Sequence, residues 1–174
     1  MSQATREDVE LCLRLYEQRR EPVLREAREW MNRFAPSSFA EVQAVMTGQS
    51  GLEANRFWRQ ATSYWEMICG LMLSDGVSPA CRDLFVGTTK EFMFCFSKVE
   101  PFLAEIRASA QPTTLQNLER LSRSQPEYER IMTYFRNVNE RMRSSQLNNA
   151  PASKKTSATK EEKKGKKGKG KSKK

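Results

Sequence analysis

Residues 53–74, EANRFWRQATSYWEMICGLMLS, hold two of the three tryptophans of the chain and its longest helical apolar face. When each residue is placed about 100° after the last, large apolar side chains gather on one broad face of a helix, and polar or small residues lie opposite. A helix with so broad an apolar face needs several partners to cover it, so the stretch predicts the central helix of a core. The face consists of Phe57, Ala61, Tyr64, Trp65, Ile68, Leu71 and Met72.

The rest of the sequence up to residue 147 supplies amphipathic helices as partners. One apolar stripe runs from Val9 to Phe34 through Pro22, which predicts a single helix kinked at the proline or, as the alternative, two helices that meet there. No stretch alternates apolar and polar residues as a strand would. The sequence therefore predicts an all-α, single-domain bundle of about five to seven helices. The other helices are expected from Ser38 to Gly48, from Ser78 to Gly87, over 89–109, after Pro112 and after Pro126.

Charge divides the chain into two parts near residue 148. Up to Ala150 there are 17 Arg and 2 Lys against 19 Asp and Glu, so this part is formally neutral. From Pro151 to Lys174 there are 11 Lys, no Arg and 2 Glu, which accounts for the whole net charge of +9. Leu147 is the last large apolar residue, and the residues after it cannot bury enough surface to offset the entropy of ordering. We expect a helical domain over 1–147 and a disordered polybasic tail over 148–174.

Three segments of the helical part stand out: LYEQRREPVLREAREW at 15–30, FWRQATSYWEM at 57–67 and KVEPFLAEIR at 98–107. They resemble segments of an uncharacterised family of small all-helical bacterial proteins. The resemblance covers most of residues 6–108 and leaves the lysine-rich tail outside. It implies an all-helical fold, and it implies no activity because none is assigned to that family.

The cysteines and the N-terminus indicate a cytoplasmic protein. Cys12, Cys69, Cys81 and Cys95 are widely spaced and form no C-x-x-C pair, so we expect buried, reduced thiols. The N-terminus MSQATREDVE has neither the basic nor the apolar region of an export signal, and no apolar run is long enough for a membrane span.

The absence of histidine from the whole sequence excludes several kinds of catalytic site. It removes the commonest general base, the Ser-His and Cys-His nucleophile pairs and the usual zinc sites. A phosphate-binding glycine loop is also missing. A carboxylate pair or a lone cysteine remains the open catalytic alternative, but none stands out on an apolar face. We therefore expect no enzymatic activity, no catalytic residues, no cofactor and no metal site.

Arg20 falls at the centre of the apolar stripe of the first helical stretch. If the helix keeps its phase across Pro22, Arg20 faces the core and needs an internal partner, for which Glu66 and Glu100 are the candidates. A kink that rotates the phase would instead let Arg20 reach water, as long charged side chains tend to do. The second interpretation is preferred, and the first stays open.

The lysine-rich tail is the strongest functional feature of the sequence. Lysine is a flexible, hydrated point charge that suits phosphate oxygens, and the tail lacks both arginine for guanine contacts and aromatic residues for base stacking. It therefore predicts non-specific binding of nucleic acid through phosphates. The predicted binding residues are Lys154, Lys155, Lys160, Lys163, Lys164, Lys166, Lys167, Lys169, Lys171, Lys173 and Lys174.

Two other classes of function compete with this prediction. An anionic membrane surface would also attract the lysines, although stable anchoring needs a second signal and the sequence has no lipidation motif. The bundle could instead be a scaffold for a protein partner, with a tail that only aids solubility. A large exposed apolar patch would favour the scaffold.

Overall fold

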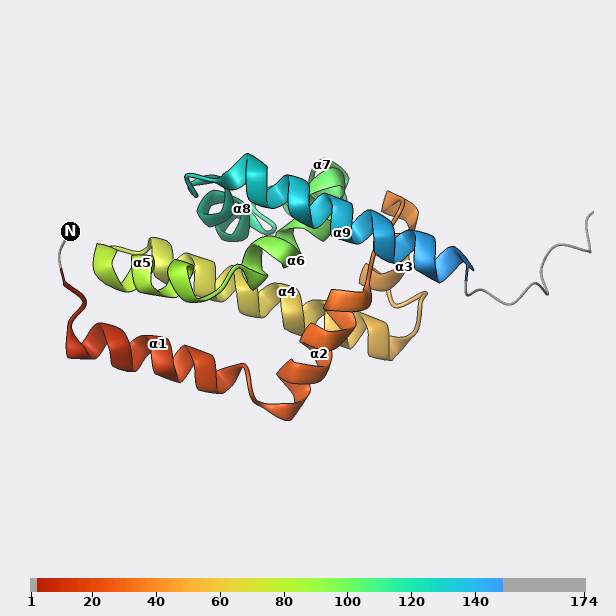
Figure 1. Cartoon of the computed structure of the whole chain (residues 1–174). Helices are drawn as coiled ribbons and strands as arrows, with labels where there is room; N and C mark the ends of the chain where they lie inside the picture. Colours follow the sequence, from red (N-terminus) through yellow and green to blue (C-terminus); the bar gives the residue numbers. More distant parts are fainter. Residues whose placement is uncertain (1–2, 149–174) are drawn as a thin grey trace, which may run out of the picture.

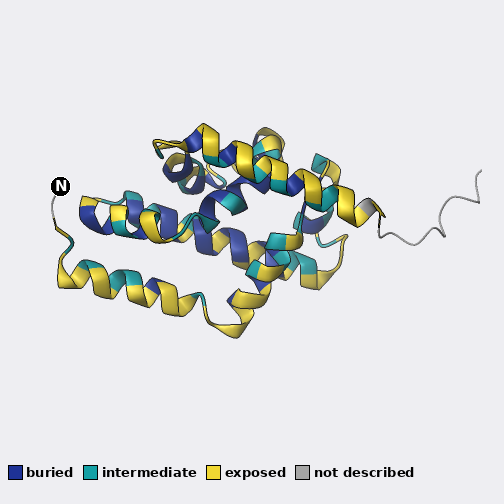
Figure 2. Ribbon diagram, in the orientation of Figure 1, coloured by how far each residue is buried: buried dark blue, intermediate teal, exposed yellow. Residues whose placement is uncertain are grey.

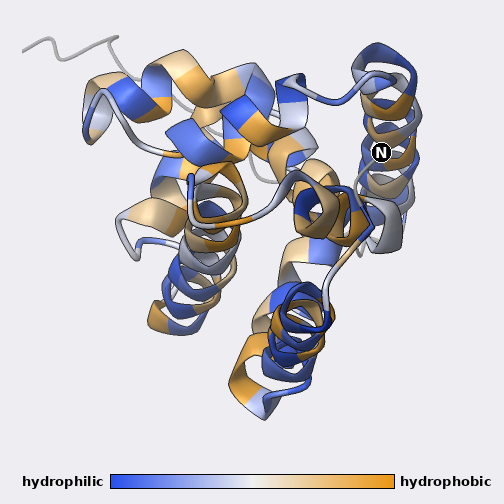
Figure 3. Ribbon diagram, turned by 90° about the vertical axis from the view of Figure 1, so that its left-hand side faces the viewer, coloured by the Kyte–Doolittle hydropathy of each residue, from blue (hydrophilic) through white to orange (hydrophobic). Residues whose placement is uncertain are grey.

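The computed structural model describes residues 3–148, and this part of the chain is an assembly of helices joined by short loops (Figure 1). No strand occurs among the described residues, which confirms the predicted all-α class. The helices carry both hydrophobic and hydrophilic residues, as amphipathic helices do (Figure 3). The elements are α1 Arg6–Gln18, α2 Pro22–Arg33, α3 Phe39–Met46, α4 Leu52–Leu73, α5 Pro79–Thr88, α6 Glu91–Val99, the 3-10 helix η1 Glu100–Phe102, α7 Leu103–Ser109, α8 Gln116–Arg123 and α9 Tyr128–Asn148.

The helix α4 is the centre of the core, as its sequence predicts. It packs most extensively against α2 and α8, and it also contacts α3, α5 and α6. Its apolar face is buried except for the half-buried Leu71, and the burial extends to Trp58, Thr62 and Cys69 (Figure 2). The predicted face was therefore correct but too narrow, because neighbours cover α4 on more than one side.

Prolines divide two of the expected helices. The stripe from Val9 to Phe34 is not one kinked helix, because α1 ends at Gln18 and α2 begins with Pro22 at its first position. Glu21 has φ −54° and ψ 130°, the extended conformation that a residue before proline prefers. The alternative of two helices is therefore the observed one. Pro101 likewise interrupts the stretch 89–109, which forms α6, η1 and α7.

The four cysteines are free thiols in the structure. Cys69, Cys81 and Cys95 are buried, as the sequence predicted, whereas Cys12 is only half-buried. Burial raises the pKa of Cys81 and of Cys95 to about 12, so both stay protonated near neutral pH. The thiols therefore act as small apolar groups of the core.

Candidate nucleic-acid interface

The eleven lysines predicted to bind nucleic acid, from Lys154 to Lys174, lie outside the described residues. The expected disorder of the tail also falls on that part of the chain, apart from Asn148. The helix α9 connects the bundle to the lysines, because it is the last described element and ends at Asn148 (Figure 1). Among the described helices, α9 is therefore the one that lies nearest to the lysines in the sequence.

The inner face of α9 is held against α6 by apolar packing. Met132 is fully buried, and the half-buried Ile131 and Phe135 pack against the core. The ring centroid of Phe135 lies 5.1 Å from that of Phe94 on α6. This packing leaves α9 as a surface helix with one covered face and one open face.

A buried lysine ties α9 to α2 and α6. The Lys98 side chain on α6 is 2% exposed, and its ammonium group donates to the carbonyl oxygens of Phe34 (2.7 Å) and Asn32 (3.2 Å) and to Oδ1 of Asn139 (2.9 Å). Asn139 in turn donates to the Ser97 hydroxyl at 3.0 Å. The first two acceptors belong to the C-terminal end of α2, where carbonyl groups lack partners within the helix. Lys98 therefore caps α2 and holds α9 through Asn139.

The electrostatic environment of Lys98 lowers its pKa. Burial is the main cause, and it lowers the pKa of Lys98 to about 7 although the nearby Cys95 acts in the opposite direction. All three hydrogen-bond acceptors are neutral amide oxygens, so no carboxylate compensates the buried charge. Because the amine is enclosed and fully hydrogen-bonded, we assign it a structural role rather than contact with phosphate.

The beginning of α9 is fixed by Glu100. The Tyr128 hydroxyl donates to Oε1 of Glu100 at 2.5 Å, and Nη2 of Arg136 lies 2.9 Å from Oε2. The Glu100 side chain is only 13% exposed, which favours a persistent interaction. Burial raises the pKa of Tyr128 and Glu100 raises it further, so the phenol remains a donor. Polar groups at and just after the end of α6 thus hold α9 through Asn139, Tyr128 and Arg136.

The outer face of α9 carries arginines and one exposed tyrosine. Arg130, Tyr134, Asn137 and Arg141 follow one another at helical spacing, and all four are exposed. Tyr134 is 64% exposed, although its ring rests against Phe135 with the centroids 5.5 Å apart. Arg130 pairs with Glu127 at 2.6 Å, but the pair is too exposed to hold the arginine firmly. We call these four residues the outer face of α9.

The structure does not bring Arg20 together with Glu66 or Glu100. Arg20 is exposed and lies in the turn after α1, so the proposed internal ion pair is wrong and the preferred alternative is the observed one. The physical reason is that the helical phase does not continue across Pro22. Glu66 accepts instead from the backbone N–H groups of Asn117 and Leu118, both at 2.9 Å, in the first turn of α8.

Arg19, the residue before Arg20, does have an internal partner. Arg19 and Arg28 both bind Glu91 at the start of α6, and Arg28 does so through two bonds of 2.8 and 2.7 Å. The three side chains are between 16% and 18% exposed. This cluster joins the end of α1, α2 and α6, and the carboxylate is fully used by the two guanidinium groups.

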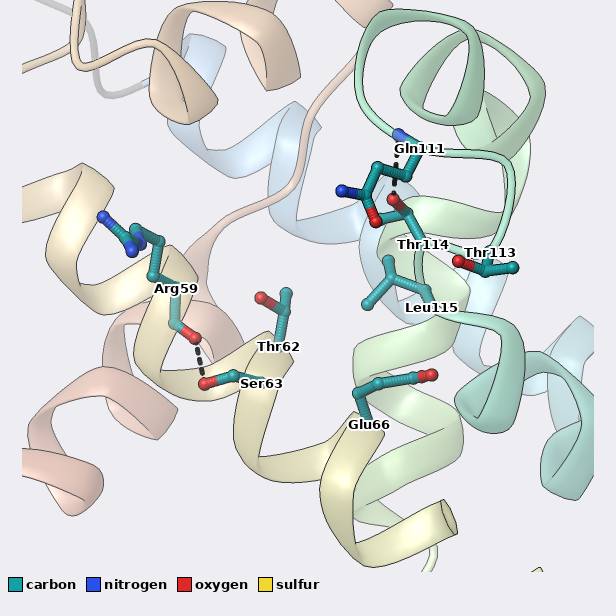
Figure 4. A pocket seen from close by; sticks show the side chains of 8 residues that line it. All are labelled: Arg59, Thr62, Ser63, Glu66, Gln111, Thr113, Thr114 and Leu115. Atoms are coloured by element: carbon teal, nitrogen blue, oxygen red, sulfur yellow. Dashed lines mark hydrogen bonds between the residues drawn. The ribbon is translucent and has the colours of Figure 1, made fainter.

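A polar pocket of about 370 Å³ lies between α4 and the connection from α7 to α8 (Figure 4). Its polar groups mostly serve the fold: Ser63 donates to the Arg59 carbonyl at 2.5 Å, Thr62 donates to the Trp58 carbonyl at 2.8 Å, and Glu66 caps α8. The pocket thus offers a guanidinium group and hydroxyl groups, without a positioned nucleophile and base. It is lined by Arg59, Thr62, Ser63, Glu66, Gln111, Thr113, Thr114 and Leu115.

Residues 3–148 offer neither an evident metal site nor a membrane span. In that part of the chain, no three His, Cys, Asp or Glu residues are grouped in a way that could hold a metal ion. None of its helices combines the length and the apolar character that crossing a membrane requires.

A family model described as "Domain of unknown function (DUF4760)" matches residues 4–125. The chain belongs to this family. The match agrees with the resemblance to an uncharacterised family, and it runs from α1 to α8. No curated protein and no solved structure matches the chain. The helix α9 and the lysine-rich segment lie beyond the residues matched to DUF4760, so they form a C-terminal part in addition to the region that the family model describes.

Sequence reasoning missed Lys98 and the outer face of α9. The sequence offered one signal for Lys98, because it is one of only two lysines before residue 151 and stands among Phe, Cys and Val residues. For the outer face of α9, the signal in the sequence is the helical spacing of Arg130, Tyr134 and Arg141. The sequence predicts a helix after Pro126, but the polar residues on this helix have the composition of an ordinary solvated surface.

Proposed function

We propose that this protein is a non-enzymatic helical protein that binds nucleic acid without sequence specificity, through phosphate contacts of its lysine-rich C-terminal segment. One observation carries the proposal: residues 151–174 hold the entire net charge of +9, next to a part of the chain that is formally neutral. Lysines that neutralise phosphates release condensed counterions, and this release supplies most of the free energy of non-specific binding.

The position of α9 supports this proposal. It carries four arginines and two glutamates, so the helix that leads to the lysines is itself basic. Its inner contacts through Lys98 and Glu100 fix it to the bundle. The free thiols suit a reducing compartment, and we place the protein in the cytoplasm.

A comparison of the full chain with residues 1–148 tests the proposal. Binding to DNA, RNA and anionic phospholipid vesicles would be measured by fluorescence anisotropy at low salt. We expect the full chain to bind DNA and RNA and the shortened chain to bind neither. Binding to vesicles alone would favour the membrane surface, and binding that survives the truncation would locate the site on the bundle.

A second candidate function, a protein-interaction scaffold, is favoured by a stripe on α1. Val9, Leu13 and Tyr16 are 41%, 57% and 58% exposed and share one side of the helix. Among the packed element pairs, α1 contacts chiefly α5, so this side has no cover within the described chain. Self-association is the simplest use of such a surface, and sedimentation of Leu13→Glu against the parent chain tests it. Equal monomer fractions for both chains would count against self-association.

A further inference from the structure

We propose that the outer face of α9 is a stacking platform for an unpaired base, so that the protein prefers single-stranded over duplex nucleic acid. The inference rests on the proposed function of the lysine-rich segment. It adds a preference for single strands, which the lysines alone do not provide. Phosphate contacts occur in both single and double strands, whereas an exposed ring distinguishes them.

Tyr134 has the exposure and the support that a stacking ring needs. It is 64% exposed, yet its ring packs on Phe135, which itself packs on Phe94 of α6 with centroids 5.1 Å apart. This chain of aromatic contacts limits the freedom of the tyrosine before any ligand binds. A side chain that is already ordered loses less entropy on binding.

The neighbouring arginines match the backbone of a strand whose base lies on Tyr134. Arg130 precedes the tyrosine by about 6 Å along the helix axis, and Arg141 follows it by about 10 Å. Arg141 forms no ion pair within the described residues, and it lines a recess of about 590 Å³ on the same helix together with Asn137, Glu140, Ser144 and Ser145. Guanidinium and amide groups at these positions can donate to phosphates on both sides of the stacked base.

The outer face is continuous with the lysine-rich segment in the sequence. Lys154 follows the end of α9 by six residues in the sequence. The positive charge of both parts complements a polyanion. In a duplex the faces of the bases are covered by their neighbours, so Tyr134 would contribute little and only the charges would bind.

The test uses the full chain with an oligodeoxythymidine and with a DNA duplex of equal length. The variants are Tyr134→Ala, Tyr134→Phe, and Met67→Ala as the control, because Met67 is an apolar side chain that is 56% exposed on another helix, α4. We expect Tyr134→Ala to weaken single-strand binding by about fivefold or more and to leave duplex binding unchanged. Tyr134→Phe should bind like the parent chain, since phenylalanine also stacks. Met67→Ala should also bind like the parent chain, because no contact with nucleic acid is proposed for Met67.

The outcomes separate this inference from the proposed function. If the parent chain binds both DNA forms equally and Tyr134→Ala has no effect, the stacking platform is refuted while the role of the lysines stands. If the parent chain binds no polyanion, both proposals fail. A thermal melt of each variant checks folding, and an unchanged midpoint is expected because the substituted side chains are exposed.

Discussion

The buried Lys98 predicts an unusual dependence of stability on pH. In the folded state burial lowers the pKa of Lys98 from 10.5 to about 7. Below pH 7 both the folded and the unfolded chain bind the proton, and the folded state bears the full cost of a buried charge. Between about 7 and 10.5 the unfolded chain binds more protons, so the free energy of unfolding must rise with pH.

The magnitude follows from the slope for one proton. One proton difference changes the free energy of unfolding by about 1.4 kcal/mol per pH unit. Above about pH 9 the opposite effect begins, because burial raises the pKa of Cys69, Cys81 and Cys95 and the unfolded thiols ionise first. The Lys98 effect is therefore clearest between pH 7 and 9, where it amounts to about 2 to 3 kcal/mol.

Lys98→Met is the perturbation that isolates this effect. The substitution removes the titrating group, so the pH dependence that Lys98 causes disappears. It also leaves the carbonyls of Asn32 and Phe34 without their donor, and this loss lowers the free energy of unfolding by the same amount at every pH. Urea unfolding followed by tryptophan fluorescence from pH 6 to 9 gives both curves. The parent curve should rise above pH 7 relative to that of the variant, because the contribution of the thiols cancels in the difference.

The matched control is Lys90→Met, since Lys90 is half-buried and donates to the Val86 carbonyl at 2.8 Å. Burial lowers the pKa of Lys90 too, but Lys90 is more exposed, so a smaller divergence is expected. Parallel curves for the parent and Lys98→Met between pH 7 and 9 would refute the reasoning. Such a result would mean that the three amide oxygens stabilise the ammonium enough to cancel the effect of burial.

Three further predictions concern the fold, and urea unfolding measures each. Glu66→Ala should lower the free energy of unfolding by about 1 to 3 kcal/mol because α8 loses the acceptor for two backbone N–H groups, and a loss below about 0.5 kcal/mol would contradict this. Arg19→Ala should lower the free energy of unfolding by about 1 to 3 kcal/mol, because Glu91 loses one of its two partners. The adjacent substitution Arg20→Ala should lower it by less than about 0.5 kcal/mol. Equal losses for the two variants would refute the assignment of Arg19 as the partner of Glu91. Removal of residues 149–174 should leave the unfolding midpoint and the helical content unchanged because that segment has no large apolar residue to add to the core, and a clear loss would show that it docks on the bundle.

The helices were predictable because their information is local. Apolar spacing identified α4 as the central helix, and the expected starts at Ser38 and Ser78 agree with the observed starts of α3 and α5. The side-chain partners were not predictable in the same way. Arg19 and Arg20 differ by one position, and which of them reaches a carboxylate depends on where α1 ends before Pro22.

The partners of Glu66 and Lys98 show a second limit. Glu66 binds backbone N–H groups and Lys98 binds mainly backbone carbonyls, and nearly every residue type carries these groups. No pattern of residue types can therefore indicate such contacts. They depend on which helix ends meet in space, as α2 and α6 do although Phe34 and Lys98 are far apart in the sequence. The nucleic-acid contacts of the lysine-rich segment remain a prediction from charge alone.

The most direct test of the central claim is the salt dependence of DNA binding. If the lysine-rich segment engages about 6 to 8 phosphates of duplex DNA, log K plotted against log salt should have a slope of roughly −5 to −7, and the slope should be the same for unrelated sequences. Replacing Lys163, Lys164, Lys166, Lys167, Lys169 and Lys171 with Gln should flatten it by about 0.9 for each lost contact. An unchanged slope in that variant, or a slope near zero in the parent chain, would contradict phosphate binding by this segment.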